Sequence, residues 1–370
     1  MTSLDFSHED LERAARYHRA RYRAFAAEIA LAAAVYAGLA WGPVGRSLWG
    51  LLDGLGWAGS AAAWAAFVVV AADLVQLPLA YWRGLTRERA WGFSRQTARG
   101  WLADRGKGLV VSLLLTAAAW TAVVGLARAF PGWWPAAVGL VLAVGVLVAS
   151  FVAPVVLEPL FNRFGPLEDE QLSAELRALG EQAGVPVRDV LVADASRRTT
   201  KVNAYVSGLG GTRRIVLYDT LLAAAGAAEL KLIVAHELGH RRDRHVLKAT
   251  LLAMLGAVVA VLVLWAVLGT SVASPRELPQ ALLLVTVLEL VGLAPAAALS
   301  RRWERRADRC SLELTGDVEA FERAHIELAR KNLSDLAPPR LVYLLLFSHP
   351  TPPERLALGR EWGRTRAARS

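Results

Sequence analysis

The sequence predicts a mainly α fold: a polytopic helical membrane bundle that carries a small α+β domain. Two observations about composition lead to the bundle. The 370 residues are 55% hydrophobic and 20% charged, and their mean hydropathy is positive, which is too apolar for an ordinary soluble domain. Runs of about 20 apolar residues, the length that crosses a bilayer, recur along the chain. One long polar segment interrupts them, and the small domain is expected there.

Six runs are apolar enough to be membrane spans. The first is short, because Gly42-Pro43 closes it, and it is the weakest of the set. The expected spans are Phe25 to Trp41, Ala61 to Tyr81, Leu109 to Ala129, Trp134 to Val155, Leu251 to Gly269, and Leu278 to Leu299.

Lysine and arginine predict the orientation, since positively charged flanks remain in the cytoplasm. Five arginines precede the first span and seven Lys or Arg lie between the second and third, whereas the opposite loops hold only Arg46 and Arg276. We therefore expect a multi-pass protein of the cell membrane, with both termini and the polar segment from Asn162 to Lys248 in the cytoplasm. The net charge of +9 is explained by these flanks, and no motif for nucleic-acid binding accompanies it.

The polar segment has the pattern of a small α+β domain. Leu167 to Gly184 carries apolar residues at helical spacing, and three short runs beyond it read as strands. These strands are Asp189 to Ala193, Lys201 to Ser207, and Arg214 to Tyr218. A helix from about Ala227 follows and is expected to run into the fifth span.

That helix contains the motif His236-Glu237-Leu238-Gly239-His240. Two histidines four residues apart lie on one helical face, so both imidazoles can reach one metal ion, and Glu237 can act as the general base on water. The spacing is typical of a zinc metallopeptidase. The alternative, two surface histidines beside a solvated carboxylate, requires the motif to arise by chance in a chain with only seven histidines.

A catalytic zinc site has three protein ligands and one open position. A third histidine close in sequence is excluded, because the positions that it and its glycine would need hold Val246 and Asp243. A distant glutamate is therefore expected, with one Zn²⁺ per chain.

Glu304 and Asp308 follow the sixth span at a spacing that puts both on one helical face. Glu304 can bind zinc, while Asp308 can hold the second ring nitrogen of a ligand histidine. The alternative is a solvated charge run, because five arginines surround the pair. Topology favours the ligand: the histidine motif precedes the fifth span and Glu304 follows the sixth, so two crossings return the chain to the same side.

The chain resembles the type I CAAX prenyl protease family, membrane-embedded gluzincins with an intramembrane chamber, and is identified as a bacterial member. Beyond the two metal-site motifs, the resemblance depends on ordered matches along most of the chain. These are Trp91-Gly92-Phe93-Ser94 with Thr97 and Asp104, Pro159 to Phe164, Asn203-Ala204-Tyr205, Ile215 to Leu222, and Ser348-His349-Pro350 followed by Arg355.

The chain also departs from the family pattern. Eukaryotic members have seven spans, and this chain is expected to lack the first of them. Arg241-Arg242 replaces a Gly-Trp-type continuation after the motif, and Thr351 interrupts the usual His-Pro-Pro. These departures bear on substrate preference more than on the chemistry.

The resemblance implies roles for four further residues. Asn203 and Ala204 would bind the extended backbone of a substrate at an edge strand, although Asn203 could instead satisfy its own turn. His349 would stabilise the oxyanion of the reaction. Arg355 would anchor either a substrate carbonyl or the carboxylates of the site.

Other ionisable residues lie outside this set. His245 is five residues beyond His240, which turns it off the ligand face of a continuous helix, so we expect a structural or membrane-proximal residue and not a ligand. Asp73, Glu158 and Glu289 lie in or at the ends of spans, where they either line a hydrated chamber or pair between helices.

The predicted function is a zinc metalloendopeptidase that cuts membrane-associated or prenylated substrates at the cytoplasmic membrane boundary. Its partners would be a peptide or protein substrate, possibly membrane-anchored, and the lipid bilayer; no oligomeric state follows. One alternative is a quality-control protease for misfolded membrane proteins. The other is a zinc-bound sensor or scaffold without catalytic activity, and the intact Glu237 argues against this second alternative.

The sequence predicts four regions along the chain. They are a membrane region with four spans (1–161), a cytoplasmic gluzincin-type metalloprotease domain (162–248), spans five and six (249–300), and a cytoplasmic C-terminal segment that completes the active site (301–370).

Overall fold

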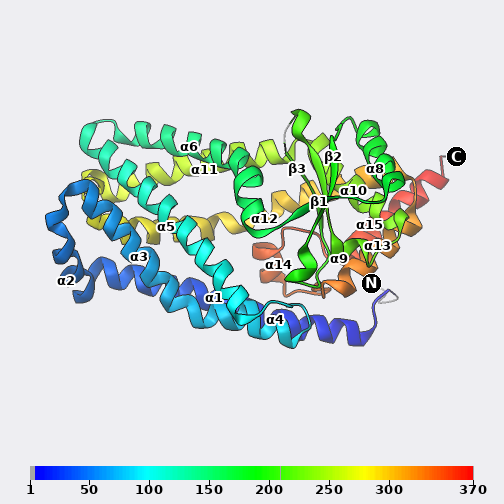
Figure 1. Ribbon diagram of the computed structural model, residues 1–370, viewed down its shortest axis with the longest axis horizontal. Coiled ribbons are helices and arrows are strands. Elements are labelled where there is room, and N and C mark those ends of the chain that lie inside the picture. The colour runs from blue at the N-terminus through cyan, green and yellow to red at the C-terminus, as the bar shows by residue number, and fades with distance from the viewer. Residues whose placement is uncertain (1–4, 209, 370) are drawn as a thin grey trace.

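The structure is a computed structural model that describes residues 5–208 and 210–369. A bundle of long helices occupies one end of the molecule, and a sheet with shorter helices occupies the other (Figure 1). Residues 1–4, 209 and 370, which the predicted domains include, lie outside the described ranges.

Within those ranges, six helices are long and apolar enough to cross a membrane, and each overlaps one predicted span. The helical membrane bundle is thereby confirmed. The six are α1 (His8–Trp41), α3 (Gly56–Tyr81), α5 (Ala98–Ala129), α6 (Trp134–Val152), α11 (His245–Leu268) and α12 (Leu278–Thr315).

The first span is longer than its apolar run. Ser7 caps the start of α1 and forms a capping box with Asp10, which satisfies amide groups that the first turn leaves free. The helix therefore begins well before Phe25 and reaches from the bundle to the sheet (Figure 1).

The bundle has an aromatic core and an apolar surface. Trp64, Trp120 and Trp134 are buried in one cluster, whereas side chains such as Leu114 and Val291 are largely exposed. Exposed apolar bands of this kind suit contact with lipid. Shorter helices join the long ones: α2 (Pro43–Leu52), α4 (Arg87–Ala90) and α7 (Glu158–Phe161).

The sheet has the strand order β1-β2-β4-β3 in the described part of the chain, so β3 lies at an edge. β2 and β4 are parallel, and β3 is antiparallel to β4. The bounds are β1 (Phe164–Pro166), β2 (Asp189–Ala193), β3 (Ala204–Ser207) and β4 (Arg214–Tyr218). The prediction matched β2 and β4, placed the start of β3 three residues too early, and missed β1, which is too short to show alternation.

Three helices pack on the strands: α8 (Glu170–Gln182), α9 (Asp219–Leu222) and α10 (Ala227–Arg242). Three more pack on α10 or α12: α13 (Val318–Lys331), α14 (Arg340–Leu346) and α15 (Pro352–Ala367). Leu176 of α8, Leu217 of β4 and Leu238 of α10 are buried in one core cluster. This core fixes one face of α10 against the sheet, while another face packs closely on α12.

The helix with the histidine motif does not run into the fifth span, which corrects that expectation. α10 ends at Arg242, and α11 begins at His245. Between them Arg244 has a left-handed backbone conformation with φ of 55°, which ends a right-handed helix. The chain therefore changes direction immediately after the motif.

Candidate metal centre

A glycine lets the two helices of the centre approach each other. A Cβ added at Gly239 of α10 would lie 2.9 Å from Cys310 Cβ and 3.1 Å from Ala307 Cα, both on α12. Side chains of ordinary size would keep the helices further apart. The glycine within the motif thus brings the histidines of α10 to the carboxylates of α12.

We expect Gly239→Ala to destabilise the protein, because overpacking of a tight contact typically lowers the free energy of unfolding by about 1–3 kcal/mol. Thermal unfolding in detergent measures the change. Gly256→Ala on α11 is the control, because an added Cβ there meets nothing within 4 Å beyond its chain neighbours and the backbone of its own helix. Equal unfolding temperatures for the two variants would contradict the close-packing account.

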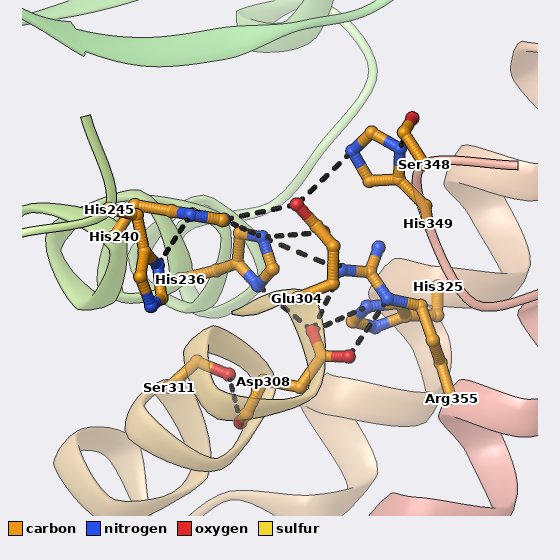
Figure 2. Close-up of polar contacts among 10 residues, drawn as sticks. All are labelled: His236, His240, His245, Glu304, Asp308, Ser311, His325, Ser348, His349 and Arg355. Carbon is orange, nitrogen blue, oxygen red and sulfur yellow. Dashed lines mark hydrogen bonds and ion pairs between the residues drawn. The ribbon is translucent and has the colours of Figure 1, made fainter. Parts of the chain in front are cut away.

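Three side chains converge where α10 faces α12. His236 Nε2 and His240 Nε2 are 3.2 Å apart, and Glu304 Oε2 and Oε1 lie 3.4 Å and 3.2 Å from them, respectively. Figure 2 shows the Glu304 carboxylate beside both imidazoles, with the glutamate coming from a different helix. The structure thus brings together the three predicted ligands.

These three residues fit a zinc ion. Their ligand atoms all lie within 4.8 Å of one another, and tetrahedral bonds of about 2.0–2.1 Å place neighbouring ligand atoms about 3.3 Å apart. The donor set of two imidazoles and one carboxylate is that of a catalytic zinc site. Burial would lower the pKa of His236, but Asp308 and Glu304 outweigh it and raise this pKa to about 9. The surroundings therefore favour positive charge at this point.

Asp308 lies behind His236, where a residue that orients a ligand is expected. Its Oδ1 is 2.9 Å from His236 Nδ1, and the residue is fully buried. A carboxylate on the second ring nitrogen fixes the orientation of a metal-binding imidazole. His325 of α13 lies on the far side, with Nε2 3.7 Å from the same oxygen, and burial lowers its pKa.

Arg355 joins the two carboxylates of α12. Its Nε donates to Asp308 Oδ2 at 2.9 Å, and one terminal nitrogen donates to Glu304 Oε2 at 2.9 Å (Figure 2). Burial lowers the pKa of Arg355, but Asp308 and Glu304 outweigh it and raise it overall. Of the two predicted targets, the guanidinium therefore contacts the carboxylates of the site, and a contact with substrate stays a prediction.

Thr351 explains how Arg355 reaches this position. Thr351 caps α15 and forms a capping box with Glu354, so the helix starts at Pro352 and places Arg355 in its first turn. The departure from His-Pro-Pro thus supplies a helix cap.

His245 contacts the second ring nitrogen of His240. The two Nδ1 atoms are 3.0 Å apart, and the buried His245 ring stacks on Trp303 with centroids 5.0 Å apart. His245 is not among the converging ligands, but its contact with His240 was not predicted. The predicted direction of the His245 side chain assumed one continuous helix from His240 to His245. The left-handed turn at Arg244 separates the two helices and brings His245 back toward His240. A non-glycine residue in that conformation leaves no clear signal in the sequence.

The predicted base and substrate residues line one cavity of about 690 Å³ beside the histidines. Burial raises the pKa of Glu237 above its ordinary value, which the neighbouring His236 and His240 oppose. His349 Nε2 lies 3.4 Å from Glu304 Oε1, and its Nδ1 is 2.7 Å from Ser348 Oγ. Asn203 and Ala204 line the same cavity, as does Arg355. His240, Glu304 and Asp308 are not among its lining residues, and each of them contacts His236, which is.

Family models match both halves of the chain. The model of peptidase family M48 matches residues 166–362. A second model, described as the CAAX prenyl protease N-terminal region with five membrane helices, matches residues 3–163.

Curated relatives agree with these matches. An uncharacterized metalloprotease of Bacillus subtilis, YhfN, is 31% identical over 300 residues, which are 76% of this chain and 69% of that protein. CAAX prenyl protease 1 of Saccharomyces cerevisiae is 29% identical over 309 residues, 76% of this chain and 68% of that protein.

The fold also has a solved counterpart. The crystal structure of S. mikatae Ste24p superposes with a TM-score of 0.85 at 24% identity, covering 96% of this chain and 90% of that one. The comparisons do not favour the quality-control and sensor alternatives, and family membership implies a metal ion, typically zinc. The chain belongs to peptidase family M48 and is a membrane-embedded metalloendopeptidase of the CAAX prenyl protease type.

Proposed function

We propose that this metalloendopeptidase binds one Zn²⁺ per chain through His236, His240 and Glu304. We further propose that it cuts peptide bonds of membrane-associated or prenylated substrates at the cytoplasmic face of the cell membrane. The observation that carries the proposal is the convergence of two imidazoles and one carboxylate, of which His236 lines a large cavity.

A bound Zn²⁺ supplies Lewis acidity, which polarises a scissile carbonyl and makes water more acidic. Glu237 takes a proton from the attacking water and returns it to the leaving amine. Its buried position, which raises its pKa, suits a group that must hold that proton between the two steps. His349 donates to the oxyanion that forms on the substrate.

The residues behind the ligands hold them in place. Asp308 fixes the ring of His236, and Arg355 balances the charge of Asp308 and Glu304 so that two carboxylates can share a buried site. These contacts orient the ligands before substrate enters, which reduces the reorganisation needed during the reaction.

The lining of the cavity supports a membrane-associated substrate. His18, Tyr22 and Phe25 of α1 line it together with His236 and Glu237, and α1 is one of the candidate spans. A substrate held in the bilayer could therefore reach the metal without leaving the membrane surface. CAAX prenyl protease 1 of yeast is the named relative from which a prenylated substrate is inferred.

The orientation is inferred from charge. Exposed arginines of α12, among them Arg302, Arg305 and Arg309, lie on the same stretch as Glu304. Both ends of the described chain lie at the end of the molecule that carries the sheet (Figure 1). Because positive flanks remain in the cytoplasm, we place the termini, the sheet and the metal centre there.

His245→Ala should weaken zinc binding without removing a ligand. If His240 binds zinc through Nε2, its Nδ1–H donates to His245, and loss of such a partner typically lowers metal affinity about 10–100-fold. Titration with a competing chelator measures this directly and does not depend on activity. Lys248→Ala, an exposed change one turn further along α11, should leave the affinity unchanged, and equal affinities for both variants would remove His245 from the metal site.

The proposal as a whole is tested with protein purified in detergent. A farnesylated peptide ending in a CAAX sequence and an unprenylated membrane protein are offered side by side, each with and without a chelator. We expect the chelator to stop cleavage, added zinc to restore it, and the farnesylated peptide to be cut faster. Faster cleavage of the unprenylated protein would favour quality control, and chelator-resistant cleavage would contradict the zinc mechanism.

A further inference from the structure

β3 is an edge strand, and few of the backbone N–H and C=O groups on its side away from β4 lack a hydrogen-bond partner within the described chain. Asn203 C=O accepts from Tyr218 N–H of β4 at 3.0 Å, so the main chain of Asn203 faces the sheet. Backbone groups alternate in direction along a strand. The N–H and C=O groups of Val202, Ala204 and Val206 therefore point away from β4, toward the side on which an added strand would pair.

An asparagine side chain already pairs with Val202. Val202 N–H donates to Asn332 Oδ1 at 3.0 Å, and Asn332 Nδ2 donates to Val202 C=O at 3.1 Å. A side-chain amide thus makes both hydrogen bonds that a substrate residue would make at this position. Asn332 also lines the cavity that contains His236 and Glu237, so it lies beside the path of a substrate.

An arginine takes the next position along the edge. Arg241 Nε donates to Val206 C=O at 3.1 Å, and a terminal nitrogen of the same guanidinium donates to this oxygen as well. Arg241 follows His240 directly, where the resemblance leads us to expect a different continuation. This departure therefore occupies an acceptor on the outer edge of β3.

Ala204 lies between these two blocked positions. No residue in the described part of the chain forms a hydrogen bond with its outward N–H or C=O groups. We propose that Ala204 is the one residue of β3 that pairs fully with substrate, and that Asn332 and Arg241 limit the pairing on either side. This inference rests on the proposed function, since it assumes that substrate binds beside the metal.

Contacts with α1 fix the segment that carries Asn332, the side chain that pairs with Val202. His18 Nε2 lies 2.8 Å from Leu333 C=O, and Tyr22 Oη donates to Asp335 at 2.6 Å. Leu333 itself has a left-handed conformation with φ of 51°, which turns the chain directly after Asn332. The asparagine is therefore fixed from both α13 and α1, and it is not on a free loop.

The expected substrate is a short extended segment. A chain that pairs at Ala204 must leave the edge within two residues on the Val202 side, and it loses an acceptor at Val206 on the other. Long strands that pair over four or more residues are disfavoured. A segment next to a chain end, a bend or a membrane anchor satisfies this limit.

A backbone ester scan tests the inference. A labelled peptide with a mapped cleavage site is made with a single ester in place of each amide, which removes one N–H donor at a time. Its binding to the Glu237→Gln variant is measured by fluorescence anisotropy, so the result does not depend on turnover. We expect the ester opposite Ala204 to weaken binding about three- to tenfold, the range for loss of one hydrogen bond. Esters two residues away on either side should change binding less than about twofold by the same reasoning.

A substitution of Asn332, which occupies the backbone groups of Val202, extends the test. With Asn332→Ala, the ester opposite Val202 should also weaken binding about three- to tenfold, because that backbone becomes free to pair. Lys331→Ala, an exposed neighbour, should keep the single sensitive position.

Two or more sensitive esters spaced two residues apart in the parent variant would overturn the inference, and so would the absence of any sensitive ester. Neither result affects the zinc mechanism, which fails only if chelation leaves cleavage intact.

Discussion

Glu304→Ala should leave the purified enzyme without zinc. Glu304 is one of three converging ligands and the only one from α12 among the described residues. Two imidazoles on one helix turn cannot complete the coordination that a catalytic zinc requires. The change also removes one of the two carboxylates that balance Arg355, whose terminal nitrogen then faces His236 with only Asp308 as a partner, so the site becomes less favourable for a cation.

Elemental analysis after dialysis measures this loss. Glu313→Ala is the matched control, because Glu313 lies on the same helix and pairs with Arg242 at the surface. We expect the control to keep zinc and activity, whereas Glu304→Ala loses both. Stoichiometric zinc in Glu304→Ala would mean that another residue is the third ligand.

Features that depend on local pattern could be predicted from the sequence. The motif fixes His236 and His240 on one face because helical spacing depends only on the backbone. The return of Glu304 to the same side follows from counting membrane crossings. β4 was predicted with its observed bounds because its apolar run is bounded by turns, and the three apolar residues at its centre are buried in the structure.

Features that depend on tertiary contacts could not be predicted. Arg244 adopts a left-handed conformation that its residue type disfavours, so the contact of His245 with His240 was missed. Arg241 and Asn332 are more than 90 positions apart in the sequence, and no spacing rule connects either with β3. Thr351 departs from the family pattern, but its role as a cap becomes clear only where α15 begins.

Glu237→Gln should keep zinc and lose cleavage. The side chain is next to a ligand but is not one of the three converging groups, so the amide leaves the donor set intact. It cannot accept the proton of the attacking water, and loss of a general base typically lowers the rate about 10²–10⁴-fold. Because glutamine has nearly the same size as glutamate, the cavity should keep its shape.

The two readouts separate the base from the ligands. Zinc content should match that of the parent enzyme while kcat falls and peptide affinity changes little. Glu229→Gln makes the same chemical change two turns earlier on α10, where the side chain pairs with Arg323 at the surface, and it should keep full turnover. Undiminished turnover in Glu237→Gln would exclude it as the base and direct attention to His349, another titratable group on the cavity wall. Loss of zinc from Glu237→Gln would instead indicate that the Glu237 carboxylate helps to hold the ion. We do not expect this, because His236, His240 and Glu304 already lie close enough together to bind it.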